Sequence, residues 1–202
     1  MTYSETDGWK IVSTYETTPR YGPRHAVIRP SYEETPGVVY IVNELASVVT
    51  THHILSNPTR ISGPVFSPIS TLPDTMTQGY APEGPMETIA CAILLLHHPG
   101  GQDELIVTNR NLPASISAEH DPWSSFPLSP TGQLGKPAFH FGAGRHLRGI
   151  GYDTRDQRLL VASREGDGFA LYKKNGSQWT ELGTRLLAGE GKIEFPLAID
   201  WL

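Results

Sequence analysis

The feature of this sequence that most limits its fold is a short order of strands and turns that occurs three times. In its first copy, a Gly22-Pro23 turn precedes an apolar run, and a turn rich in proline and acidic residues follows. The apolar run Val38–Val42 comes next, and a third β-rich run begins at Val48. Apolar runs of this length between turn residues predict an antiparallel meander.

The same order returns after Glu87 and after Gly144. Asn43, Asn109 and Ser163 each follow the second apolar run of a copy, which spaces the copies roughly 50 to 65 residues apart, close to the period of propeller blades with loop insertions. We therefore predict an all-β protein, a β-propeller of four-stranded antiparallel blades forming a single domain over residues 1–202. Three repeats and part of a fourth predict about four blades in an open arc.

Composition agrees with this fold class and excludes some functions. Hydrophobic residues make up 38% of the chain, which also has 20 glycines and 17 prolines, as expected of a turn-rich β protein. A formal net charge of -5 without a basic stripe argues against nucleic-acid binding. The N-terminus lacks a secretory pattern and no apolar run is long enough to span a membrane, so we expect a cytoplasmic protein.

Segments outside the repeats give further expectations. Gly8–Thr17 is expected to be the outer strand of an incomplete blade, and Ser56–Pro85 a long loop with one short strand near Val65. That loop is either a binding element or a tolerated insertion. Asn175-Gly176 predicts a two-residue hairpin turn. Residues 192–202 are expected to open another blade, and the unpaired edges at both ends predict self-association.

Charged residues stand at equivalent ends of the repeated strands. Arg24 precedes one strand, Glu44 follows the next, and Arg110 occupies the place of Glu44 in the second repeat. Equivalent strand ends converge around the axis of a propeller, so two guanidinium groups could hold a substrate carboxylate and Glu44 could move a proton. The alternative is an ordinary ion pair between Arg24 and Glu44 within one blade.

Histidine and cysteine give weaker signals. Neighbouring residues of a strand point to opposite faces, so the two His-His pairs do not predict a metal site, and we expect no metal. His25 beside Arg24, and His146 beside Arg145, are candidates for polar contacts with a ligand. Cys91 lies in an apolar run and is expected to be a buried, inert thiol.

The chain resembles the seven-bladed propeller lactonase family, which contains cofactor-free 6-phosphogluconolactonases and fungal 3-carboxy-cis,cis-muconate cyclases. The resemblance rests on GPRH (Gly22 to His25), YIVNEL (Tyr40 to Leu45), TNR (Thr108 to Arg110) and the weaker GRH...LLVAS of residues 144 to 163. Family members are much longer, so the resemblance implies that about three N-terminal blades are absent from this sequence, including one that supplies a further active-site histidine.

The resemblance implies a site and a chemistry. Arg24 and Arg110 would bind a carboxylate or phosphate, Glu44 would be the acid/base group with His25 beside it, and no metal or organic cofactor would be needed. In the third repeat, Arg145 and His146 would take the places of Arg24 and His25 as ligand-binding residues.

Two functions follow as expectations. The first is lactone-ring chemistry on a carboxylated small molecule, either hydrolysis of a lactone or cyclisation of a muconate-type acid. The alternative is a non-catalytic propeller fragment that serves as a binding or assembly module.

Overall fold

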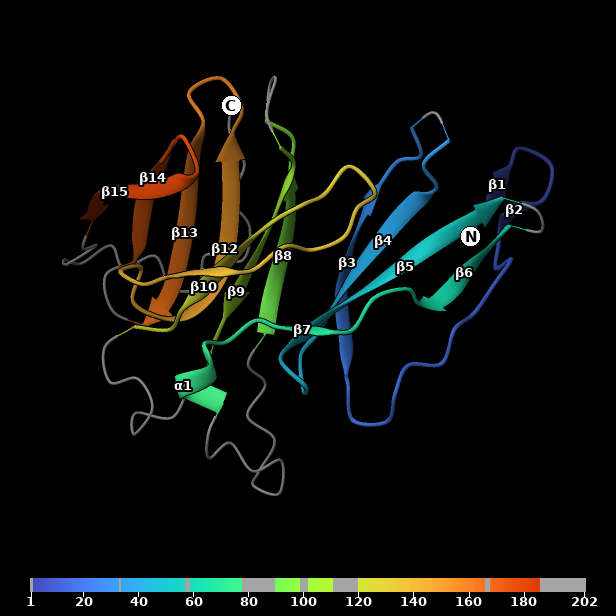
Figure 1. The fold of residues 1–202 in the computed structure, drawn as a ribbon, viewed down its shortest axis with the longest axis horizontal. Coiled ribbons are helices and arrows are strands. Elements are labelled where there is room, and N and C mark those ends of the chain that lie inside the picture. The colour runs from blue at the N-terminus through green and yellow to red at the C-terminus, as the bar shows by residue number, and fades with distance from the viewer. Residues whose placement is uncertain are drawn as a thin grey trace.

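The computed structural model describes residues 2–32, 34–56, 59–77, 90–98, 102–110, 120–165 and 168–185. These residues form three antiparallel sheets that stand side by side, and a small separate hairpin (Figure 1). The all-β prediction and the partial propeller are therefore confirmed. None of the helices formed by the described residues is both long and apolar enough to cross a membrane.

Each of the three sheets is a blade whose strands follow one another in chain order. Blade 1 contains β3 (Pro23–Arg29), β4 (Gly37–Asn43), β5 (Val48–Ser56) and β6 (Thr59–Pro64), with the short β7 (Ile69–Ser70) also paired to β5. Blade 2 contains β8 (Ala90–Leu96), β9 (Glu104–Asn109), β10 (Trp123–Pro127) and β11 (Ala138–His140). Blade 3 contains β12 (Arg145–Asp153), β13 (Arg158–Glu165), β14 (Phe169–Asn175) and β15 (Gln178–Arg185).

The first strands of the blades lie next to one another, β3 beside β8 and β8 beside β12. They are therefore the inner strands of the arc. In each blade the start of the inner strand pairs with the end of the second strand: Pro23 with Asn43, Ala90 with Asn109, and Leu147 with Ser163. This register confirms the repeat predicted from the sequence. All of these strand ends lie on the same side of the arc, the side where the inner strands begin.

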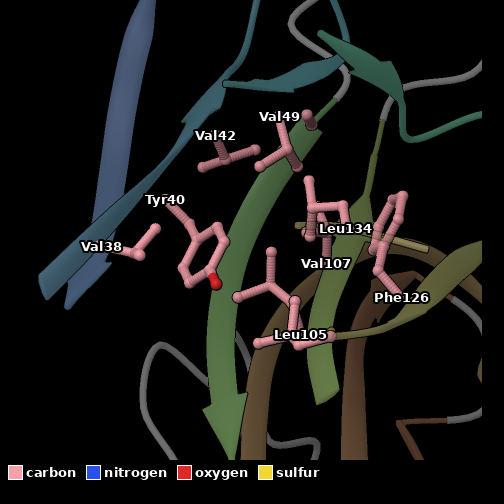
Figure 2. Packing of buried hydrophobic residues seen from close by; sticks show 10 residues of the cluster. Val38, Tyr40, Val42, Val49, Leu105, Val107, Phe126 and Leu134 are labelled. Carbon is pink, nitrogen blue, oxygen red and sulfur yellow. The ribbon is translucent and has the colours of Figure 1, made fainter. Parts of the chain in front are cut away.

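The cores lie between the blades. Figure 2 shows Val38, Tyr40 and Val42 of β4 packed against Leu105 and Val107 of β9. The strand β4 is buried along nearly its whole length because blade 2 covers one of its faces and neighbouring strands flank it. The hydroxyl of Tyr40 also donates a hydrogen bond of 2.8 Å to the carbonyl of Gly132 in a blade 2 loop.

A second core fills the space between blades 2 and 3. Trp123 of β10 is fully buried there, and Trp179 of β15 lies edge-on to it with ring centroids 5.9 Å apart. The second strand of a blade is buried on both of its faces. This burial explains why the second strands of the repeats are the most hydrophobic parts of the sequence.

Several local predictions were wrong. The strand expected over Gly8–Thr17 covers only β2 (Gly8–Lys10), which pairs with β1 (Thr2–Ser4) in a hairpin and not with a blade. The segment expected to be a loop after Ser56 contains β6, β7 and the helical turn α1 (Asp74–Thr77). Val65 lies just beyond β6, whose polar edge sequence lacks the alternation that would reveal a strand.

One predicted turn is displaced by one residue, and one predicted strand cannot be compared with the structure. The hairpin between β14 and β15 is present, but its two-residue turn is Gly176-Ser177, one residue later than expected, because Asn175 pairs with Gln178. The strand expected in residues 192–202 lies outside the described residues.

Candidate functional site

A bulge in the inner strand of blade 1 places the first arginine of the site. Pro23 pairs with Asn43 and His25 with Val42, so Arg24 is an extra residue without a partner in the ladder. A bulge of this kind re-aims a side chain and is common beside functional sites. The turn before it requires Gly22, whose φ is +65° and where an added Cβ would lie 2.5 Å from Cγ of Leu45.

Two asparagines fix the strand ends from which the other charged residues project. The side-chain amide of Asn43 donates to the hydroxyl oxygen of Thr50 at 3.1 Å and to two backbone carbonyls. Asn109 donates to the carbonyls of Thr71 and Pro122, both at 3.0 Å, and accepts from the Thr71 hydroxyl at 2.8 Å. Buried amides with these partners hold the backbone in place, so the next residues, Glu44 and Arg110, have defined positions.

The side chains of two blades meet on one carboxylate. Nη1 of Arg24 lies 3.0 Å from Oε1 of Glu44, and Nη2 of Arg110 is hydrogen-bonded to the same oxygen. The exposed fractions of these side chains are 29% for Arg24, 15% for Glu44 and 7% for Arg110. The cluster is therefore open to solvent on the Arg24 side and closed on the Arg110 side.

The electrostatics of the cluster decide its protonation. Burial alone would raise the pKa of Glu44, but the hydrogen bonds and positive charges of Arg110 and Arg24 outweigh it and hold the pKa below its usual range. The pKa of His25 is also lowered, first by burial and then by the charge of Arg24, although Glu44 acts in the opposite direction. At neutral pH the site therefore contains an ionised glutamate and a neutral imidazole.

The third blade differs from the sequence expectation. Leu147 pairs with Ser163 and Gly149 with Ala162, so the bulged residue that corresponds to Arg24 is Arg148 and not Arg145. His146 has a φ of 61°, and its backbone N–H donates to the carboxylate of Asp121. The structure brings Arg24, Glu44 and Arg110 together, and the charges of these residues act on the pKa of His25. It does not place Arg145-His146 at the position that corresponds to Arg24-His25.

Blade 2 has the same bulge with different residues. Ala90 pairs with Asn109 and Ile93 with Val107, so Cys91 follows the first pair as Arg24 follows Pro23. Cys91 is a free, buried thiol, as expected from the sequence. Within the described part of the chain, no group of three potential metal ligands is close enough to hold an ion.

A second charged cluster, which was not predicted from the sequence, lies at the other end of β9. Glu104 is buried and accepts hydrogen bonds from Lys174 and from Trp179, the latter at 3.2 Å, while His98 Nε2 lies 3.2 Å away. Burial would raise the pKa of Glu104, but these hydrogen bonds and the charge of Lys174 hold it below its usual range. A cavity of about 610 Å³ adjoins this cluster, whose contacts link blade 2 to blade 3.

The fold and the site together define a class of protein: a β-propeller with an arginine–glutamate cluster at one end of its inner strands. The chain belongs to the seven-bladed β-propeller lactonase family, whose model matches residues 2–190. A comparison with curated proteins found no match.

Solved structures share the fold. A candidate 6-phosphogluconolactonase from Bacteroides fragilis has a TM-score of 0.58 at 19% identity, and one from Bacteroides uniformis 0.57 at 19%. A protein from Lactobacillus plantarum has a TM-score of 0.57 at 18% identity. The matches cover 83%, 82% and 85% of this chain but 40%, 40% and 44% of those chains, respectively. The chain thus spans less than half the length of these similar structures.

Proposed function

We propose that the protein carries out lactone-ring chemistry on a carboxylated small molecule, with hydrolysis of the lactone as the favoured direction. The observation that supports this proposal best is the contact of Arg24 and Arg110, from neighbouring blades, with the same oxygen of Glu44. Membership of the lactonase family and the likeness to candidate 6-phosphogluconolactonases agree with it.

Binding of the substrate would begin at the two arginines. A guanidinium group offers several N–H donors in a planar fork and holds a carboxylate or phosphate in a bidentate pair. A substrate carboxylate that shares Arg24 and Arg110 with Glu44 would weaken their hold on Glu44. The pKa of Glu44 would then rise toward its ordinary value, which would make Glu44 a better base when substrate is bound.

Hydrolysis uses the ionised form of Glu44. Glu44 accepts a proton from a water molecule whose oxygen forms a bond to the lactone carbonyl carbon, and an arginine stabilises the oxyanion. The ring C–O bond then breaks, and the proton passes from Glu44 to the departing oxygen. The products are an open hydroxy acid and the regenerated carboxylate of Glu44.

Cyclisation of a muconate-type acid would need the opposite protonation. There a substrate carboxylate oxygen adds to a carbon–carbon double bond, and Glu44 must supply a proton to the adjacent carbon. Because the two arginines lower the pKa of Glu44, the protonated form is scarce at neutral pH. This favours the hydrolytic direction.

His25 has a supporting role in the proposal. Its lowered pKa leaves the imidazole neutral near pH 7, so it is able to accept the proton of water or to relay it to Glu44. We expect His25→Gln to slow turnover less than a change at Glu44. Arg145 and His146 have no role in the proposed reaction, because the register gives the equivalent position to Arg148.

The test is Glu44→Gln. We expect turnover of a carboxylated lactone, followed by proton release, to fall at least ~100-fold, since general-base catalysis contributes that much or more. Binding of the open acid should persist because both arginines remain. Wild-type turnover should be constant above about pH 5 and fall as the pH drops through the lowered pKa of Glu44, since only the ionised form acts as the base.

The control is Glu16→Gln, which removes an exposed carboxylate that does not act on the pKa of Glu44 or His25 and should leave turnover unchanged. Unchanged turnover in Glu44→Gln would remove Glu44 from the mechanism. A wild-type chain that binds the acid without turning over any lactone, or any muconate followed by ultraviolet absorbance, would support the binding-module alternative.

A further inference from the structure

A third arginine occupies the bulge of the inner strand of blade 3. Arg148 follows the pair Leu147–Ser163 as Arg24 follows the pair Pro23–Asn43. The inner strands β3, β8 and β12 are consecutive neighbours around the arc. The backbone therefore places Arg148 on the same side of the arc as Arg24, the side where the inner strands begin. The Cys91 bulge of blade 2 lies between them.

The arginines of blades 2 and 3 each have an unused hydrogen-bond donor. The Nε atoms of Arg110 and Arg148 are buried, and neither has a hydrogen-bond partner among the described residues. Buried donors of this kind are normally satisfied, so each unsatisfied one calls for an explanation. A ligand with acceptor oxygens would supply the missing partners.

The charges around Arg148 also call for an anion. Burial, followed by the positive charges of Arg110, Arg164 and Arg24, lowers the pKa of Arg148. Glu44 contacts Arg24 and Arg110, whereas Arg148 has no ion pair with any carboxylate of the described residues. A guanidinium with like charges around it and no ion pair of its own among the described residues favours the binding of an additional negative group.

We propose that Arg148 binds a second anionic group of the ligand, so that the site selects small molecules with two anionic groups over those with one. Arg24 and Arg110 hold the first group, a carboxylate or phosphate, and Arg148 holds the second. The inference rests on the proposed function for the identity of the first contact. It adds Arg148 as a residue that determines specificity.

The test is a set of calorimetric titrations on the 202-residue chain with butyrate and with the dicarboxylates succinate, glutarate and adipate. We expect the best dicarboxylate to bind the wild type roughly 10-fold more tightly than butyrate, because a charge-assisted hydrogen bond has about that effect. Arg148→Gln should remove this advantage and leave butyrate binding unchanged. Arg24→Gln should weaken both classes of acid.

Arg155→Gln is the matched control, since Arg155 is exposed in the turn at the other end of the β12–β13 hairpin. It should bind every acid like the wild type. The melting temperature of Arg148→Gln should equal or exceed that of the wild type, because the change removes a partly buried positive charge with like charges around it. This measurement shows that the variant is folded.

The outcomes separate the two proposals. If Arg24→Gln weakens both classes and Arg148→Gln keeps the dicarboxylate advantage, the assignment of Arg148 is wrong while the proposed function stands. If Arg145→Gln alone removes the advantage, the correspondence between the Arg24 and Arg148 bulges is wrong. If neither class of acid binds the wild type, or Arg24→Gln changes nothing, the proposed function fails as well.

Discussion

At the scale of single residues, His140 has an environment that favours its neutral form. Its ring stacks on Trp123 with centroids 3.9 Å apart and an angle of 21°, and its Nε2 lies 3.1 Å from the hydroxyl oxygen of Ser125. Burial between blades lowers the pKa of His140 to about 4, with Glu104 and Lys174 acting in opposite directions. An imidazolium would lose its hydration here, and no carboxylate of the described residues is hydrogen-bonded to His140 to compensate for that loss.

The stability of the protein should therefore depend on pH. Between pH 6.5 and about 4 the unfolded chain binds a proton at His140 that the folded chain does not, so folding stability is complete above pH 6.5 and falls as the pH decreases. The loss at pH 5 relative to pH 7.5 should be up to about 2 kcal/mol. Urea unfolding at the two pH values measures it.

His140→Phe keeps an aromatic ring against Trp123 but removes the titration, so its unfolding midpoint should change less between these pH values. Ser125→Ala is the control, because it removes only the hydrogen bond and should keep the pH dependence. An equal pH dependence in His140→Phe and wild type would assign the effect to other groups.

The charged triad Arg24, Glu44 and Arg110 could be predicted from the sequence because each residue adjoins an apolar run at an equivalent place in the repeat. Arg148 could not be predicted in this way, because the sequence Arg145-His146 is more similar to Arg24-His25 than the sequence around Arg148 is. Only the pairing of Leu147 with Ser163 shows that the strand has to advance three residues before the bulge. Glu104 was missed because its partner Lys174 is 70 residues away and meets it only when two blades pack together.

At the scale of elements, the loop after β10 packs tightly against blade 1 through Gly132. Gly132 has a φ of +84°, and an added Cβ would lie 2.8 Å from Cγ2 of Val38 and 3.0 Å from the hydroxyl of Tyr40. The carbonyl of Gly132 accepts the hydrogen bond of that same hydroxyl. Gly132 is thus required both by the backbone conformation and by the close approach of two blades.

Two glycine-to-alanine changes should separate strain from steric contact. Gly176 in the β14–β15 turn has a φ of +61° and nothing within 4 Å of an added Cβ, so Gly176→Ala should cost about 1 kcal/mol from backbone strain alone. Gly132→Ala has the same strain and must also displace Val38 or Tyr40. It should cost about 2 to 4 kcal/mol in urea unfolding.

Equal costs for the two variants would show that Val38 and Tyr40 move aside without loss of stability. The close contact between Gly132 and blade 1 would then add no stability.

The strands that could be predicted from the sequence are those buried on both faces, such as β4 and β9, because such burial demands continuous apolar runs. Edge strands such as β6 need only backbone pairing. Their residues are polar, and their ends depend on partners that sequence patterns do not reveal.

At the scale of the whole molecule, the three described blades form part of a ring, and no other described blade covers one face of the first blade, although Tyr15 packs on His52 there. Val27 of β3 packs against the core between blades 1 and 2, so the next residue, Ile28, points to the opposite face. Ile28 is 59% exposed. In a closed propeller the face of each blade is covered by its neighbour, whereas the outermost strands are exposed in any case.

We predict that the 202-residue chain, expressed by itself, associates through this face. Light scattering after size-exclusion chromatography should give a mass that increases with concentration, and Ile28→Glu should shift it toward a single chain. Leu182→Glu is the control, because Leu182 is 53% exposed on the outermost strand β15 and should change the mass little.

A wild-type chain that stays monomeric and unfolds cooperatively at high concentration would contradict this prediction. Association through the strand expected in residues 192–202, with Phe195 and Ile199 as its apolar contacts, is a separate expectation that lies outside the described residues. Charged substitutions there, made beside Ile28→Glu, would show which end of the arc associates.

The bulges of the inner strands separate two things that usually change together in evolution. The ladder on either side of the bulge keeps the same pairing in all three blades, although the bulged residue is arginine in blades 1 and 3 (Arg24, Arg148) and cysteine in blade 2 (Cys91). A mutation at such a position would change a side chain of the proposed ligand site and leave the hydrogen bonds that build the sheet intact. Duplicated blades could therefore inherit one architecture and diversify their ligands one position at a time.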